Sequence, residues 1–157
     1  MKIPTLMIGA SLVVAGVGFG ALQLYSSESA IALQPDDETL VALGKQVYDA
    51  NCASCHGKQL EGQPNWKSPG PDGKMPAPPH DRNGHTWHHA DKLLFELTKF
   101  GVQKFAGENY ESNMPAYEGV LSDREIVASL SYIKSRWPEA IRKRHDAINE
   151  RMKGQEQ

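Results

Sequence analysis

The sequence has 157 residues, of which 39% are hydrophobic, and a formal net charge of −2. A charge this close to zero gives no electrostatic argument for a nucleic-acid partner. Both cysteines, Cys52 and Cys55, lie in one five-residue stretch, which excludes a framework of disulfides that joins distant segments.

An uncharged apolar run over 3–24 follows Met1 and Lys2. It is long enough to cross a bilayer, so residues 1–25 are expected to form a transmembrane helix or signal anchor. The positive charge before the run and the acidic residues after it predict that the rest of the chain lies across the cytoplasmic membrane, in the periplasm. Cleavage near Ala30-Ile31-Ala32, which has the small-x-small form, is the alternative and would give a soluble periplasmic protein.

Residues 26–36 are serine-rich and contain Pro35, which predicts a tether between that segment and a folded domain. From 37 to 51 apolar residues recur at helical spacing, and the acidic residues at the start suit the helix dipole. This helix would deliver the chain to Cys52. The segment 57–90 is rich in proline and glycine and has no sustained periodicity, so it predicts one long irregular loop.

Further helices are expected toward the end of the chain. One spans 91–100 and stops at Gly101; another opens on the capping-box pattern of Ser122 and Glu125 and runs to Pro138. Residues 138–157 mix both charge signs along a sparse apolar stripe, which predicts an exposed helical extension. No strand pattern or repeat is present in the sequence, so the expected fold class is all-α, with about four short helices and long loops around a central group.

The motif Cys52-Ala53-Ser54-Cys55-His56 carries the chemistry. Its two thiols lie one helical turn apart, so both can bond to one edge of a porphyrin while the His56 ring turns under the iron. A thioredoxin-like redox pair would need a βαβ setting, and a zinc site would need a second pair of ligands. The motif therefore predicts covalent haem attachment.

Together these features resemble the class I monohaem cytochromes c over roughly residues 37–137, with CASCH after an N-terminal helix, a later Met-Pro pair and a closing helix. The resemblance implies a cytochrome c-like fold around one haem c, attached through Cys52 and Cys55, with His56 as an iron ligand. It also implies that a glycine and an aromatic residue of the first helix pack against the last helix, and that a loop proline accepts a hydrogen bond from the His56 ring. The residues in those positions are Gly44, Tyr48, Tyr132, Ile133 and Pro78 or Pro79.

The iron still needs a sixth ligand, and a methionine thioether favours the ferrous state. Two Met-Pro-Ala triplets compete for this position, one at Met75 and one at Met114. Met114 lies on a loop just before the closing helix, where class I proteins keep the ligand, so Met114 is the expected ligand. Met75 is expected to line the haem edge or to face solvent.

Four of the six histidines fall within ten residues of the long loop: His80, His85, His88 and His89. Neutral imidazoles, together with Asp81, suit copper or zinc, so a second metal site is one interpretation. The other is that Arg82, Trp87 and one or two histidines hydrogen-bond the haem propionates or cap the next helix. A bis-histidine haem, in which one of these histidines replaces methionine, is a third.

The function expected from this set is single-electron transfer by an electron carrier rather than an enzyme. The expected partners are a quinol-oxidising cytochrome complex or dehydrogenase on one side and a terminal oxidase or reductase on the other. The alternative is a haem protein whose histidine-rich loop binds copper or another metal and acts in metal handling or sensing. A haem enzyme with an open sixth position is a third hypothesis.

Overall fold

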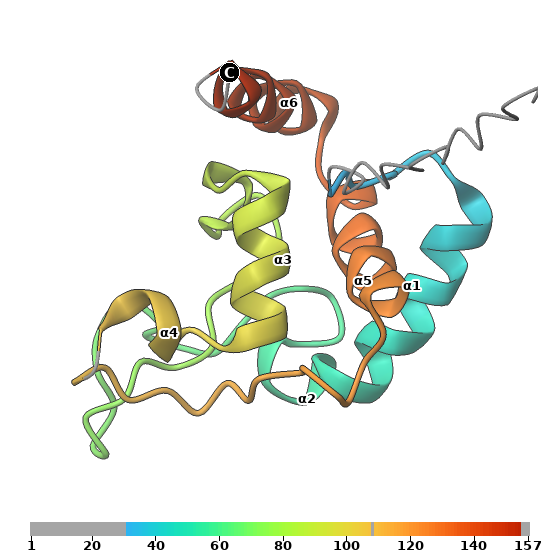
Figure 1. The fold of residues 1–157 in the computed structure, drawn as a ribbon. Helices are drawn as coiled ribbons and strands as arrows, with labels where there is room; N and C mark the ends of the chain where they lie inside the picture. Colours follow the sequence, from blue (N-terminus) through green and yellow to red (C-terminus); the bar gives the residue numbers. More distant parts are fainter. Residues whose placement is uncertain (1–30, 108, 155–157) are drawn as a thin grey trace, which may run out of the picture.

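The structure is a computed structural model that describes residues 31–107 and 109–154 (Figure 1). This part of the chain consists of helices and loops and contains no strand, which confirms the all-α fold class. In chain order its elements are α1 (Glu38–Asn51), α2 (Ala53–His56), the 3-10 helix η1 (Thr86–His88), α3 (Asp91–Phe100), α4 (Gln103–Ala106), α5 (Asp123–Ser135) and α6 (Glu139–Lys153).

The predicted membrane segment over 1–25 lies outside the described residues and stays a prediction. No helix within 31–107 or 109–154 combines the length and the hydropathy that crossing a bilayer requires. Residues 31–36, expected to belong to a tether, instead pack on the domain. Leu33 is buried and its N–H donates to Asp91 Oδ2 at 2.9 Å, while the Gln34 N–H donates to Ser131 Oγ at 2.9 Å.

Helices α1 and α5 begin where their capping residues predict. Asp37 precedes α1 and accepts a hydrogen bond from the Leu40 N–H at 2.9 Å. Ser122 and Glu125 form a reciprocal capping box at the start of α5. Each arrangement satisfies backbone N–H groups that a helix start otherwise leaves without a partner, which stabilises the helix by about 1 kcal/mol.

Helices α1 and α5 form the principal helix pair of the core (Figure 1). They cross closely at Gly44, where an added Cβ would lie 1.9 Å from the carbonyl oxygen of Ala128. One turn further along, the rings of Tyr48 and Tyr132 lie 5.5 Å apart, and Ile133 is buried in the same core. The packing implied by the family resemblance for these residues is confirmed.

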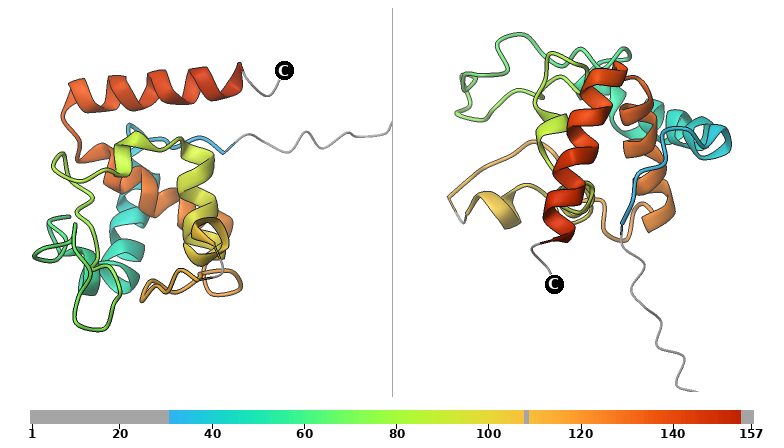
Figure 2. Two further views of the ribbon diagram at one scale, coloured as in Figure 1. Left: turned by 90° about the vertical axis from the view of Figure 1, so that its left-hand side faces the viewer. Right: turned by 90° about the horizontal axis from the view of Figure 1, so that it is seen from above.

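Helix α6 lies across one end of the molecule, over η1 and near the start of α3 (Figures 1 and 2). The helix was predicted from sequence, but its docking was not. His145 on its inner face is fully buried, and its Nε2 donates to the His89 carbonyl oxygen at 2.9 Å and lies 3.4 Å from Asp91 Oδ1. The ring of Trp137 packs edge-on against it. The extension is therefore part of the folded domain.

His145 is expected to make the protein less stable as the pH falls. Burial, and then the nearby Lys134 ammonium, lowers the pKa of His145, although Asp91 and Asp146 oppose this shift. The unfolded chain therefore binds a proton at a higher pH than the folded chain does. The neutral ring contributes its full stability above about pH 6.5, the ordinary pKa of histidine. Below that pH the free energy of unfolding falls by at most about 1.4 kcal/mol per pH unit. Denaturant unfolding between about pH 7.5 and about pH 5.5 measures the free energy of unfolding as a function of pH. In His145→Gln this free energy should fall less steeply as the pH is lowered. His88→Gln, at an exposed position, is the control, and an unchanged slope in His145→Gln would contradict the prediction.

Candidate functional site

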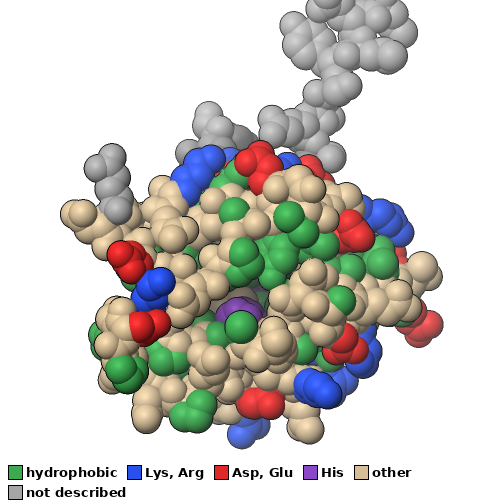
Figure 3. All heavy atoms as spheres, turned by 90° about the horizontal axis from the view of Figure 1, so that it is seen from below, with side chains coloured by type: hydrophobic (Ala, Val, Ile, Leu, Met, Phe, Trp, Pro, Cys, Tyr) green, Lys and Arg blue, Asp and Glu red, His purple; other side chains and the backbone are tan. Residues whose placement is uncertain are grey.

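Helix α2 brings the residues of the CASCH motif into one short turn. Cys52 ends α1 and caps α2, Cys55 follows within the same turn, and His56 ends it. Cys52 is half-buried, Cys55 is exposed and His56 is buried. Figure 3, which views the molecule from the side where α2 lies in Figure 1, shows a histidine at the floor of a hollow that hydrophobic and other uncharged groups surround. This face therefore has an uncharged recess in which part of one imidazole is exposed.

The imidazole of His56 is held in one orientation. Its Nδ1 donates to the carbonyl oxygen of Pro78 at 2.9 Å, so the lone pair lies on Nε2. Burial lowers the pKa of His56, although the hydrogen bond to Pro78 opposes that shift, and the ring is therefore neutral at pH 7. Of the two prolines that the resemblance left open for this role, the acceptor is Pro78 and not Pro79. The carbonyl of Pro79 instead faces Gly84, where an added Cβ would lie only 1.9 Å away.

The competing interpretations of the motif find no support in its surroundings. Burial, and then the neighbouring Cys55, raises the pKa of the free Cys52 thiol to about 11, whereas a thioredoxin-like pair needs a lowered thiol pKa. The setting is helical rather than βαβ. Within the residues that the structure describes, no group of three or more His, Cys, Asp or Glu side chains is placed to hold a metal ion such as zinc.

The two Met-Pro-Ala triplets lie on neighbouring segments. Asn113 Nδ2 donates to Asp72 Oδ2 at 3.3 Å, and Lys74 Nζ lies 3.7 Å from a carboxylate oxygen of Glu111. These contacts join the part of the long loop before Met75 to the segment before Met114. The structure therefore brings both candidate ligands to the same region instead of separating them.

Tyr117 ties the segment that carries Met114 to the haem-attachment motif. Its hydroxyl donates to the carbonyl oxygen of Asn51, the residue before Cys52, at 2.7 Å. Its backbone N–H bonds to carbonyls at the end of α3, and its side chain is buried. Sequence reasoning missed this residue, although an aromatic residue three positions after Met114 was a visible signal.

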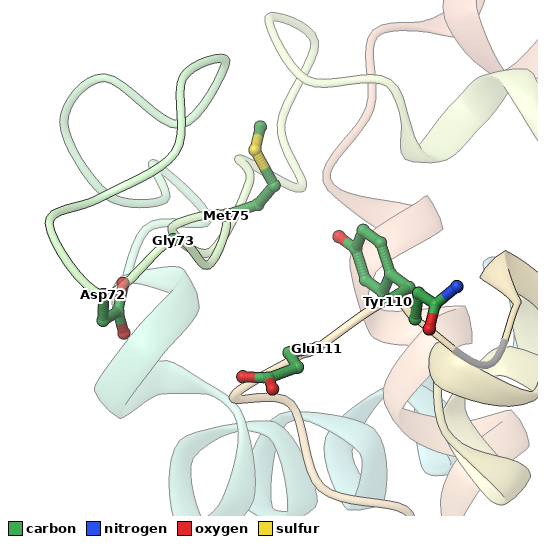
Figure 4. A pocket seen from close by; sticks show the side chains of 6 residues that line it. Asp72, Gly73, Met75, Tyr110 and Glu111 are labelled. Atoms are coloured by element: carbon green, nitrogen blue, oxygen red, sulfur yellow. The ribbon is translucent and has the colours of Figure 1, made fainter.

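A cavity of about 360 Å³ lies between the loop of Met75 and the segment before Met114 (Figure 4). It is lined by Asp72, Gly73, Met75, Asn109, Tyr110 and Glu111. The motif Cys52–His56 does not line it, so this cavity is not by itself the haem site. Met75 borders this open space, so it competes with Met114 as a candidate ligand.

Trp87 supplies a test of whether these residues fit a haem. Its indole N–H is buried and has no acceptor within the described part of the chain. A buried donor without a partner costs about 1–3 kcal/mol, which points to an acceptor that the protein does not provide. A haem propionate is such an acceptor, and Trp87 packs at the edge of the core. The residues therefore fit the group, with Trp87 as the predicted propionate partner.

The four clustered histidines do not form a group that could hold a metal ion, within the described residues. His80 stacks on His56, His85 stacks on Trp66, and His88 packs against Trp87. His85 and His89 meet edge to face with ring centroids 5.4 Å apart. Each of these side chains packs against another aromatic ring, and no observation on residues 80–89 favours a second metal site.

His80 is also poorly placed to be a sixth ligand. Its ring lies face to face with the His56 ring, with centroids 4.0 Å apart. To bind iron, His80 would have to give up both this stack and the contact of its Nδ1 with Thr86 Oγ1. The bis-histidine hypothesis therefore finds no support at His80.

Comparison with known proteins agrees with this geometry. Residues 41–137 match the family model for cytochrome c. A cytochrome c6 of Tetradesmus obliquus is 32% identical over 95 residues, which cover 59% of this chain and 86% of that protein. The FixP subunit of a cbb3-type cytochrome c oxidase from Bradyrhizobium diazoefficiens is 29% identical over 117 residues, which cover 71% of this chain and 37% of that protein.

A third relative, the cytochrome c subunit of the cytochrome bc1 complex of Corynebacterium efficiens, is 38% identical over 47 residues, which cover 30% of this chain and 16% of that protein. The chain thus spans most of the cytochrome c6 but much less than half of either complex subunit. No solved structure gives a significant match.

Proposed function

Because the chain belongs to the cytochrome c family, and so carries one covalently attached haem c, we propose that it transfers single electrons between redox proteins. The bound haem supplies an iron that takes up and releases one electron. Cys52 and Cys55 would hold that group, and His56 would ligate its iron. The proposed role is that of an electron carrier.

The observation that carries the proposal is the restrained His56 ring beside two thiols of one helical turn. The hydrogen bond from Nδ1 to Pro78 fixes the tautomer and leaves Nε2 as the ligating atom. The same bond makes the imidazole a better donor to iron. A ring that is already oriented and neutral loses little free energy when it binds the metal.

We further propose that Met114 fills the sixth position. Its segment is anchored by the hydrogen bond from Tyr117 to Asn51, directly beside Cys52. The Met114 N–H donates to Ser112 Oγ at 3.0 Å, which gives the loop a local restraint. A filled sixth position leaves no coordination site for a substrate, which supports a carrier rather than a haem enzyme.

Replacement of each of the two methionines by alanine in turn tests this ligation, and with it the proposed function. The oxidised wild-type holoprotein is expected to show the absorption of a six-coordinate haem with a sulfur-to-iron charge-transfer band. Met114→Ala should lose that band and lower the reduction potential by on the order of 0.1 V, because a thioether favours the ferrous state. Met75→Ala should keep both, as should Met152→Ala, an exposed control.

Two outcomes would contradict this ligation. Loss of the band in Met75→Ala, with its retention in Met114→Ala, would move the ligand to the other triplet. A wild-type spectrum without a sixth protein ligand, together with ready binding of an added small ligand, would favour the haem enzyme over the carrier.

We propose that the folded domain lies on the periplasmic side of the cytoplasmic membrane, with residues 1–25 as its membrane anchor. This rests on the uncharged apolar run over 3–24 and on two relatives named as subunits of a cbb3-type oxidase and a bc1 complex. The proposed partners are accordingly a quinol-oxidising complex or dehydrogenase and a terminal oxidase or reductase. Fractionation tests the anchor: haem protein that leaves the membrane pellet in salt alone would contradict it.

A further inference from the structure

We propose that His80 is a positioning residue for the iron ligand His56: its ring packs flat on the His56 imidazole and fixes the plane of that ring. The inference rests on the proposed role of His56 as the proximal ligand. It assigns a structural role to one of the clustered histidines, which the Cys52–His56 motif alone leaves without a role.

The contact is a face-to-face stack. The two ring centroids lie 4.0 Å apart and the ring planes differ by 23°. The hydrogen bond to Pro78 restrains one edge of the His56 ring, at Nδ1. The flat His80 ring packs on the face of the imidazole and so adds a restraint on its plane. Because Pro78 and His80 are two residues apart, one turn of the loop supplies both restraints.

His80 is itself held firmly. Its Nδ1 lies 2.8 Å from Oγ1 of Thr86, which is buried. Its backbone N–H donates to the Leu60 carbonyl at 2.8 Å, and its carbonyl accepts from the Trp137 indole N–H at 2.7 Å. The ring edge meets Tyr48 of α1. A residue fixed on so many sides can transmit the rigidity of the core to His56.

Two effects on the iron follow from this packing. The plane of the axial imidazole sets its overlap with the iron orbitals, so a ring free to rotate changes the magnetic signature of the oxidised haem. The stacked ring also keeps water from the buried face of His56. Water favours the more highly charged ferric state, so its exclusion keeps the reduction potential high.

Three variants of the holoprotein test the proposal, with the reduction potential and the electron paramagnetic resonance of the oxidised haem as readouts. His80→Ala should lower the potential and shift or broaden the resonance. His80→Phe keeps a flat ring but lacks the hydrogen bond to Thr86, so it should shift both by much less than His80→Ala. Asn83→Ala, an exposed change in the same loop, is the control and should alter neither.

If His80→Ala fails to fold, Thr86→Val provides the second route. It removes the hydroxyl that orients the His80 ring while keeping the size of the side chain, and should shift the resonance in the same direction by a smaller amount. The proposal is overturned if His80→Ala, or Thr86→Val in its place, leaves potential and resonance unchanged. It is also overturned if His80→Phe shifts both as far as His80→Ala.

Failure of this inference is distinguishable from failure of the proposed function. A wild-type protein without the spectrum of a six-coordinate haem would refute the electron-carrier proposal whatever His80 does. A normal wild-type spectrum, with a potential that does not respond to the His80 variants, would refute the positioning role alone.

Discussion

Replacing Gly44 by alanine is expected to destabilise the protein by about 2–4 kcal/mol, although alanine is the better helix former. The added Cβ would lie 1.9 Å from the carbonyl oxygen of Ala128 and 3.0 Å from the Cβ of Tyr132. Neither neighbour can rotate away, because one is backbone and the other is the stem of a side chain. Helices α1 and α5 must therefore separate, which also loosens the contact between Tyr48 and Tyr132.

Denaturant and thermal unfolding of the holoprotein measure this effect, with an expected drop in melting temperature on the order of 10 °C. Gln46→Ala, an exposed change on the same helix, is the matched control and should alter the free energy of unfolding by less than about 0.5 kcal/mol. Helix propensity alone predicts that Gly44→Ala gains about 1 kcal/mol. A gain of that size would refute the close crossing of the two helices.

Replacing both Cys52 and Cys55 by serine should abolish covalent attachment of haem completely. The chain has no other cysteine, so no thiol can take over the bond to the porphyrin. Serine keeps the size of the side chain but cannot form a thioether, which separates the chemistry from the packing. Haem staining of the denatured polypeptide measures the result: the double variant should show none, and either single variant should retain haem through the remaining thiol.

The control for this experiment is Ser54→Ala, an exposed change between the two cysteines that should retain full haem staining. His56→Ala adds a second comparison. It should keep covalently bound haem but lose the absorption of a six-coordinate iron, because attachment and ligation use different atoms. Haem that stays attached to the double serine variant would contradict the assignment of the cysteines.

The main helices could be predicted because their ends carry local chemical signals. Asp37 caps α1, Ser122 and Glu125 form the box that opens α5, and Gly101 follows the last residue of α3 with a φ of +85°. Periodicity does not say which helix approaches which. The partner of Gly44 was therefore available only from the family resemblance, and the short helix α4 (Gln103–Ala106) carried no signal that was recognised.

The core of the site could be predicted because its chemistry lies in five consecutive residues. Its supports could not, since they depend on tertiary folding. Tyr117 reaches Asn51 across 66 positions of the sequence. The choice of Pro78 over Pro79 depends on which carbonyl the loop turns inward, and nothing in the sequence distinguishes His80 from the other histidines of its cluster.

Two segments that were expected to be exposed each contain one buried residue among those that the structure describes. Serine and proline around 26–36 and alternating charges over 138–157 are both typical of solvated chain. Yet Leu33 and His145 are buried, and each contacts the buried carboxylate of Asp91. A prediction from composition uses the average character of a segment, so it cannot identify a single residue of that segment that is buried against the domain.

The hydrogen bonds that close the domain have a consequence for how it folds. Those from Leu33 to Asp91, from Trp137 to His80, from Tyr117 to Asn51 and from Gln34 to Ser131 join residues 58, 57, 66 and 97 positions apart. Each contact requires a long stretch of chain to close before it stabilises anything, and closure entropy grows with that length. Contact order therefore predicts slower folding than that of a simple helical bundle of the same size, with chain closure rather than helix formation as the rate-limiting event.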